Sequence, residues 1–340
     1  MRILFIIPDI VHSKIRRFAD VVLKRYPRLW RNPIMRDRVI NPWLNVQVTF
    51  GGTLNLMRHC ALVRSMGVDT ALVTPSGKDT YGRFKVATVP FVSWNDIAPD
   101  DVCVVPDFVS EIANRISGRV IVYLQAPHLL HADFDYHNPR VRLWTDSPFM
   151  LAKCQKVFSE KEISIVPNII DPAMFPFRPQ ADREPGLIFA FPRKGRDFIR
   201  ATQDAYSKSG GTYWRFELID GLTVTELAHE MGRPQAFLAS AEVEGCALPP
   251  QESMAAGIVV VGKTARGANF SMEHRHTAMV AESPEEAASG LRELESSELR
   301  EHVSRNAYEF IRRYFPEGEP TQLWQNTLRE LGVDVPLATS

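Results

Sequence analysis

The chain has 340 residues, 45% of them hydrophobic, which is enough to bury a large core and suggests two domains. Its 40 lysines and arginines balance its 40 aspartates and glutamates, so the overall charge indicates no nucleic-acid partner. The sequence contains no apolar run of about 18 residues and no apolar leader, so it predicts neither a spanning helix nor a signal peptide.

The cysteines are widely spaced and form neither a Cys-x-x-Cys pair nor a cluster with histidines. Such spacing is typical of reduced, mostly buried thiols in a cytoplasmic protein rather than of a disulfide framework. We therefore expect a cytoplasmic location. The cysteines are Cys60, Cys103, Cys154 and Cys246.

Apolar runs alternate with amphipathic stretches in the first half of the chain, a pattern typical of a parallel sheet covered by helices. We expect helices over residues 54–65, 109–116 and 148–158. The expected strands are residues 2–7, 69–74, 85–89, 101–105, 119–124, 143–145 and 163–166.

Residues 12–43 are rich in lysine and arginine, with aromatic and aliphatic residues interleaved at near-helical spacing. One interpretation is a solvated helix with an apolar core face. The other is a basic amphipathic stretch that lies on an anionic membrane. In that case the protein is peripheral on the inner face of the plasma membrane.

Two weaker signals occur in the first half. Gly51 and Gly52 precede an expected helix, where glycines let backbone N–H groups approach a phosphate, although a plain turn explains them almost as well. His128 follows the strand expected at 119–124, and a lone histidine is as readily structural as functional.

Residues 173–186 are rich in proline and charge, and we expect them to link a domain at 1–172 to one at 187–315. Two amphipathic helices are expected at 299–314 and 321–331. Two doubly wound sheets would place a ligand cleft between the carboxyl ends of their strands. The strands expected in the second half are residues 186–191, 215–219, 236–239, 258–261 and 278–280.

Glu244 and Glu252 lie eight positions apart, between two apolar runs. Proline is tolerated in a first helical turn, so we expect a helix to open at residues 249–250 and to end at Gly257. A helix start after a glycine-containing loop offers free N–H groups and a positive dipole end to an anion. Glu252 lies near the helix start and is better placed to accept hydrogen bonds from sugar hydroxyls than to bind a phosphate. The pattern therefore predicts a site for a phosphate-linked sugar.

The segment from Glu244 to Gly257 resembles the Glu-x7-Glu signature of retaining GT-B glycosyltransferases, the group 1 glycosyl transferases. That family commonly reads Glu-Gly-Phe-Gly-Leu-Pro-x-x-Glu-Ala-Met-Ala-x-Gly, and the chain departs from it at Cys246 and Ala247. Residues 166–171 and Phe175 are similar to the family's Pro-Asn-Gly-Val-Asp-x-x-x-Phe segment. The resemblance implies an α/β GT-B fold of two Rossmann-like domains facing each other across a cleft. It also implies that a helix within 316–340 returns to the N-terminal domain.

Roles for individual residues follow from the same resemblance. Arg193 and Lys194, two cations after an expected strand, would stabilise the leaving diphosphate, with Arg196 as an alternative to Arg193. Glu244 would hold the transferred sugar, assisted by His128, and Glu252 would bind the donor ribose. The other residues expected at the donor are Gly51, Gly52, Gly245, Cys246, Ala247, Leu248 and Gly267.

The function that the resemblance implies is transfer of a sugar, with retention, from a nucleotide-diphosphate sugar to a hydroxyl of a glycan, lipid-linked or small-molecule acceptor. Bacterial glycan or glycoconjugate synthesis is the expected setting. We expect no metal requirement, no cofactor and no nucleic-acid partner. A non-catalytic binding protein with the same fold, a GT-B sugar-nucleotide epimerase and an inverting transferase are the alternatives.

Overall fold

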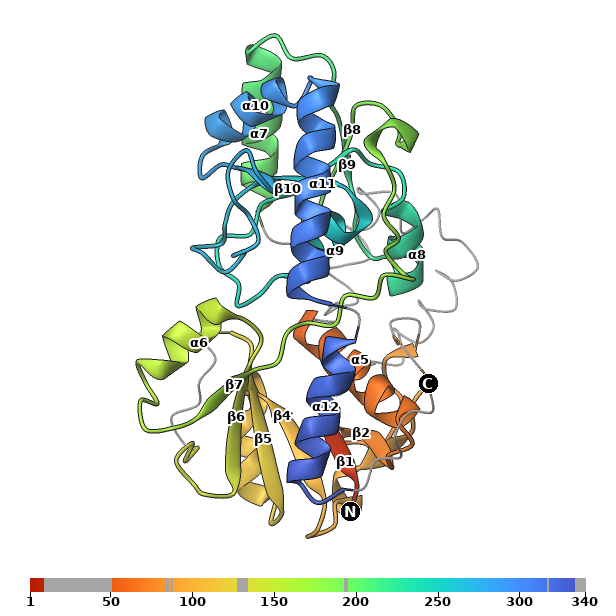
Figure 1. Cartoon of the computed structure of the whole chain (residues 1–340), viewed down its shortest axis with the longest axis vertical. Helices are drawn as coiled ribbons and strands as arrows, with labels where there is room; N and C mark the ends of the chain where they lie inside the picture. Colours follow the sequence, from red (N-terminus) through yellow and green to blue (C-terminus); the bar gives the residue numbers. More distant parts are fainter. Residues whose placement is uncertain are drawn as a thin grey trace.

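The computed structural model describes residues 1–8, 51–82, 86, 88–126, 134–192, 195–316 and 318–333. Two parallel sheets, one from each half of the sequence, lie one above the other along the long axis of the molecule (Figure 1). The basic segment 12–43 falls outside the described residues, so both interpretations of it stay open. The four cysteines are free thiols.

The N-terminal sheet has seven strands in the order β3-β2-β1-β4-β5-β6-β7, and every pairing in it is parallel. Its central strands are buried on both faces, which explains their continuous runs of valine, isoleucine and leucine. The strands are β1 (Ile3–Ile6), β2 (Thr70–Thr74), β3 (Phe91–Ser93), β4 (Val102–Pro106), β5 (Arg119–Leu124), β6 (Val141–Thr145) and β7 (Ile163–Ile165).

Helices cover both faces of this sheet. Helix α5 (Gly51–Ser65) packs Leu56, Met57 and Cys60 against one face. The 3-10 segment η4 (Asp107–Arg115) and helix α6 (Pro148–Gln155) cover the other face. A short 3-10 turn, η3 (Trp94–Asp96), follows β3.

Two local predictions for this half were wrong. The described residues of 85–89 form no strand, and the edge strand is instead β3, whose pairing follows the hydrogen bond from the Leu72 N–H to the carbonyl of Pro90. The helix expected at 109–116 is instead a 3-10 segment with a kink at Val109. Short connectors between strands often form 3-10 turns.

The C-terminal sheet has five strands in the order β12-β11-β10-β8-β9, again all parallel. Its strands are β8 (Leu187–Ala190), β9 (Arg215–Leu218), β10 (Ala236–Ala239), β11 (Val259–Gly262) and β12 (Ala278–Val280). Its helices are α7 (Arg196–Lys208), α8 (Val224–Glu230), α9 (Leu248–Ala256), α10 (Pro284–Glu293) and α11 (Ser297–Tyr314), and the short η5 (Gln180–Asp182) precedes β8.

Helix ends in this half follow ordinary capping rules. Thr223 and Ser283 form capping boxes with Glu226 and Glu286 at the starts of α8 and α10. Helix α9 differs, because its N-cap residue Ala247 makes no side-chain hydrogen bond, and it ends at a left-handed glycine, Gly257, with φ 84°.

Helix α12 (Glu319–Glu330) follows α11 but lies beside the N-terminal sheet rather than the C-terminal one (Figure 1). Its Trp324 is fully buried and belongs to the core cluster that also contains Phe5 and Trp144. Helix α12 is therefore anchored on the half of the molecule that contains β1.

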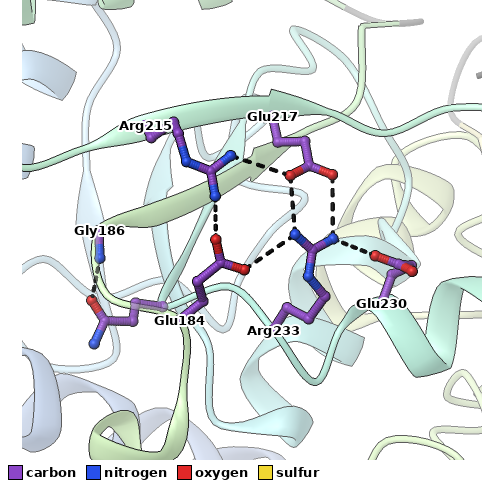
Figure 2. Close-up of polar contacts among 7 residues, drawn as sticks. Glu184, Gly186, Arg215, Glu217, Glu230 and Arg233 are labelled. Carbon is purple, nitrogen blue, oxygen red and sulfur yellow. Dashed lines mark hydrogen bonds and ion pairs between the residues drawn. The ribbon is translucent and has the colours of Figure 1, made fainter. Parts of the chain in front are cut away.

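Five charged side chains near the amino ends of β8, β9 and β10 form an ion-pair network (Figure 2). Arg233 pairs with Glu230 at 2.5 Å, Glu184 at 3.1 Å and Glu217 at 3.3 Å, and Arg215 joins Glu184 to Glu217. The network ties the segment before β8 to the start of β9 and to the end of α8. These partly exposed groups link neighbouring elements of the C-terminal domain.

Replacing Arg233 with alanine is expected to lower the free energy of unfolding by about 1 kcal/mol, because it leaves three glutamates close together without their shared cation. Urea denaturation at low salt measures the loss, which should shrink in about 1 M NaCl, where the Debye length is about 3 Å. Arg275→Ala removes a single exposed pair with Glu293 and serves as the control with little effect. Equal losses in the two variants would contradict a network contribution.

Candidate functional site

A cavity of about 640 Å³ lies between the two sheets. Its walls are built from residues that directly follow strands of both sheets, which is where ligands bind in open α/β folds. The N-terminal wall includes Asp107 after β4, Gln125 after β5 and Asp146 after β6. The C-terminal wall includes Phe191 after β8, Ile219 after β9 and Ser240 after β10.

The loop that precedes α9 lines this cavity from Val243 to Leu248. Within the described part of the chain, the backbone N–H groups of residues 245–248 donate no hydrogen bond. Pro249 and Pro250 contribute no N–H, so these loop amides are the donors that the helix start presents. Unpaired amides beside the positive end of a helix suit an anionic ligand such as a phosphate. We call residues 245–248 the amide loop.

Glu244 and Glu252 flank the amide loop, and both line the cavity. Glu252 is 4% exposed and accepts a hydrogen bond from Arg58 of α5, with 2.7 Å between Nη2 and Oε1. Arg58 also donates to the carbonyl of Ile169. No local sequence pattern marks Arg58 as part of the site, because it lies 194 positions before Glu252.

The two halves of the molecule touch at the amide loop. A Cβ added to Gly245 would overlap the backbone carbonyl oxygen of Gln125. The Ser147 hydroxyl donates to the carbonyl of Gly245 at 3.3 Å, and Asn168 Nδ2 donates to the carbonyl of Cys246 at 3.2 Å. Gly245 thus allows the C-terminal loop to rest directly on the N-terminal domain.

One compartment of the cavity is apolar and belongs to the C-terminal half. Phe191 packs edge-on against Phe237 with ring centroids 5.1 Å apart, and Ile219, Leu222 and Leu227 complete the wall. This compartment was not predicted from the sequence. The available signal was the Asp-Gly turn that directly follows the strand expected at 215–219.

The predicted donor residues divide into three groups. Gly51, Gly52, Glu244, Glu252 and the amide loop line the one cavity, and Gly52 faces the Gln125 side chain. Gly267 is not among the residues that line it; its nearest side chain is the ring of Phe149, 3.6 Å from where a Cβ would lie. Arg193, Lys194 and His128 lie outside the described residues, so their assignments stay predictions. Arg196 is the first residue of α7.

Residues 215–310 match the family model described as Glycosyl transferases group 1. This stretch contains both glutamates and the amide loop. Over these residues the chain matches that family of glycosyltransferases. The family and the fold class predicted from the Glu-x7-Glu segment are thereby confirmed.

Individual relatives agree with this match. The glycosyltransferase is 25% identical to an alpha-1,6-glucosyltransferase of Actinobacillus pleuropneumoniae serotype 7 over 239 residues, or 65% of this chain and 70% of that one. Its fold is similar to that of a glycosyltransferase from Rickettsia africae, with a TM-score of 0.64, 10% identity, and 97% and 98% of the two chains covered.

A second structural neighbour is the pneumococcal O-GlcNAc transferase GtfA, solved in complex with UDP and GlcNAc, with a TM-score of 0.57 and 14% identity. The similarity covers 71% of this chain and 58% of GtfA. At these identities the structures show a shared GT-B fold.

Among the described residues of the glycosyltransferase, no helix is long and apolar enough to cross a membrane. The same residues contain no group of three or more histidines, cysteines, aspartates or glutamates that could hold a metal ion.

Asp146 is a deeply buried carboxyl group of the cavity wall, at 2% exposure. Burial raises the pKa of Asp146 well above its ordinary value, and the negative charges of Asp107 and Glu244 raise it further, against a hydrogen bond from the Ser147 hydroxyl. The carboxyl group is therefore neutral in the folded glycosyltransferase at a pH where the unfolded chain ionises it.

This raised pKa makes the stability of the protein depend on pH. Above about pH 4 the folded state binds more protons at Asp146 than the unfolded state does, so stability falls as the pH rises. Asparagine mimics the neutral acid, and Asp146→Asn is expected to be more stable than the wild type near about pH 7, with the difference shrinking toward about pH 4.

Urea denaturation across this pH range measures the difference between Asp146→Asn and the wild type. Asp204→Asn, at an exposed position of α7, is the control without a pH-dependent gain. A constant difference at every pH would contradict a neutral Asp146.

Proposed function

We propose that this protein transfers a sugar from a nucleoside-diphosphate sugar to an acceptor hydroxyl, with retention at the anomeric carbon. The observation that carries the proposal is the amide loop, which lines the cavity between Glu244 and Glu252 and whose N–H groups have no hydrogen-bond partner among the described residues. Backbone donors of this kind suit a diphosphate, and a carboxylate on each side suits the hydroxyl groups of two sugar rings.

The donor has a natural place along this cavity. Its nucleobase would occupy the apolar compartment around Phe191 and Ile219, and its ribose would lie against Glu252. The diphosphate would lie on the amide loop, and the transferred sugar would reach Glu244. Arg193 and Lys194 follow Pro192 at the carboxyl end of β8, in sequence next to this compartment, and would act on the leaving diphosphate.

Catalysis would then be mainly electrostatic. The bond from the anomeric carbon to the diphosphate oxygen breaks as the acceptor oxygen bonds to that carbon, and the acceptor's hydroxyl proton passes to the leaving diphosphate. Cations and backbone amides stabilise the negative charge that develops on the diphosphate. The acceptor hydroxyl would approach from the N-terminal wall, which Asp107, Gln125 and Asp146 form. These uncharged and acidic groups favour a neutral, hydroxyl-bearing acceptor such as a glycan or a glycosylated lipid in bacterial glycan synthesis.

The first donors to test are UDP-glucose and UDP-GlcNAc, because one relative is named a glucosyltransferase and one structural neighbour was solved with UDP and GlcNAc. GDP- and ADP-sugars extend the panel. Donor hydrolysis without an acceptor, followed by transfer to simple glycosides, would be measured by release of the nucleoside diphosphate. Lys194→Ala is expected to lower this rate by about 10²-fold.

Proton NMR of the product distinguishes the alternatives. A product with the donor's anomeric configuration supports retention, and the opposite configuration identifies an inverting transferase. Conversion of the sugar nucleotide to an epimer without release of diphosphate would identify an epimerase. Tight donor binding with no turnover of any donor would identify a binding protein.

A further inference from the structure

The ion pair between Arg58 and Glu252 connects the two halves of the molecule. Arg58 lies on α5 against the N-terminal sheet, and Glu252 lies on α9 of the C-terminal domain. Both side chains are 5% exposed. Among the residues that the structure describes, this is the only ion pair that joins the two domains.

Arg58 binds one oxygen of the Glu252 carboxylate and leaves the other oxygen available to a ligand. Its Nη2 donates to Oε1 of Glu252, and the second carboxylate oxygen has no hydrogen-bond partner among the described residues. Glu252 lines the large cavity, whereas Arg58 lines a separate cavity of about 310 Å³ behind it. The arginine therefore contacts the Glu252 carboxylate from the side opposite the large cavity, where the donor would bind.

Arg58 is itself held in place by the carbonyl of Ile169. Its Nη1 donates to the carbonyl of Ile169 at 2.9 Å, and the Ile169 N–H donates to Asn55 Oδ1 at 3.0 Å. Asn55 lies one helical turn before Arg58 on α5 and donates to the Tyr123 hydroxyl. Because the guanidinium is planar and its Nη1 is fixed in this way, its Nη2 faces Glu252 in one orientation.

We infer that Arg58 is a positioning residue for the donor: it orients Glu252 toward the ribose and holds the two domains in the closed arrangement. The inference rests on the proposed function of Glu252. If the domains separate, Arg58 and Glu252 part and the carboxylate loses its fixed orientation. Donor binding and domain closure are thus coupled through one buried ion pair. Removing either partner would leave the other as an uncompensated buried charge.

The test compares binding of UDP and of 2′-deoxy-UDP by calorimetry, since only UDP carries the 2′-hydroxyl that an oriented Glu252 would recognise. The wild type is expected to prefer UDP by about tenfold or more. Glu252→Gln and Arg58→Ala should each reduce this preference to less than about threefold, and the double variant should lose no more than either single variant. Small-angle scattering of the ligand-free protein should show a larger radius of gyration in Arg58→Ala.

Two further variants make the test decisive. Arg142→Ala removes an exposed arginine–glutamate pair with Glu330 at 2.6 Å on the same domain and should keep both the preference and the wild-type radius. Arg58→Lys retains the charge but cannot reach both Glu252 and Ile169 with a planar fork, so its preference should be intermediate. It also replaces Arg58→Ala if that variant does not fold.

The outcomes separate the inference from the proposed function. If the wild type prefers UDP and Glu252→Gln loses the preference while both Arg58 variants keep it and stay compact, the inference about Arg58 is wrong. If the wild type fails to bind UDP or to discriminate the deoxy analogue, the proposed role of Glu252 fails. In that case an unchanged radius in Arg58→Ala overturns the closure role as well, and an increased radius supports it.

Discussion

Replacing Gly245 with alanine is expected to reduce glycosyl transfer by about a hundredfold while leaving each domain folded. The added Cβ would overlap the backbone carbonyl oxygen of Gln125, which lies at the carboxyl end of β5. A backbone atom cannot rotate aside as a side chain can. The amide loop must therefore move away from the N-terminal wall, and a misplacement of about 1 Å in an active site can cost about 10²-fold in rate.

The measurement is the rate of donor turnover, with thermal unfolding as a check that the protein remains folded. Gly318→Ala is the matched control, because a Cβ at that position meets no atom within 4 Å. In the Gly245→Ala variant, the affinity for nucleotide should change less than the rate of turnover, since the amide loop itself remains in the C-terminal domain. Wild-type turnover in Gly245→Ala would show that the contact with Gln125 is not needed for catalysis.

Replacing Trp324 with alanine is expected to destabilise the protein by about 3–5 kcal/mol, the usual cost of removing a buried aromatic side chain. Trp324 is fully buried, and its ring lies 5.1 Å from Trp144 and 5.6 Å from Phe5 between centroids. Its Nε1 donates to Nδ1 of His59 at 3.0 Å. Burial lowers the pKa of His59 to about 3, so this ring is neutral and can accept the bond.

Urea denaturation measures the loss, and hydrogen exchange should show that α12 and the N-terminal sheet lose protection together. Gln322→Ala changes an exposed residue of the same helix and should alter stability by less than about 0.5 kcal/mol. A Trp324→Ala variant with wild-type stability would mean that α12 contributes little to the N-terminal domain.

The amino-acid sequence by itself determined the elements whose signals are local. The apolar run at β10 (Ala236–Ala239) and the alternation of strands with helices were sufficient to predict two parallel sheets. The helix start at Pro249 and Pro250 and the stop at Gly257 were predicted from residues that act on their own backbone. The spacing of Glu244 and Glu252 was sufficient to indicate the resemblance to the glycosyltransferase family, because both residues lie within one continuous loop and helix.

Tertiary structure alone decided which distant residues meet. The edge strand β3 is not where the apolar pattern predicted it, because pairing depends on the neighbouring strand β2 rather than on local preference. Arg58 reaches Glu252, and Gln125 leaves no room for a side chain at Gly245, only because the two sheets face each other. Such contacts depend on how domains pack, and no short-range pattern in the chain encodes them.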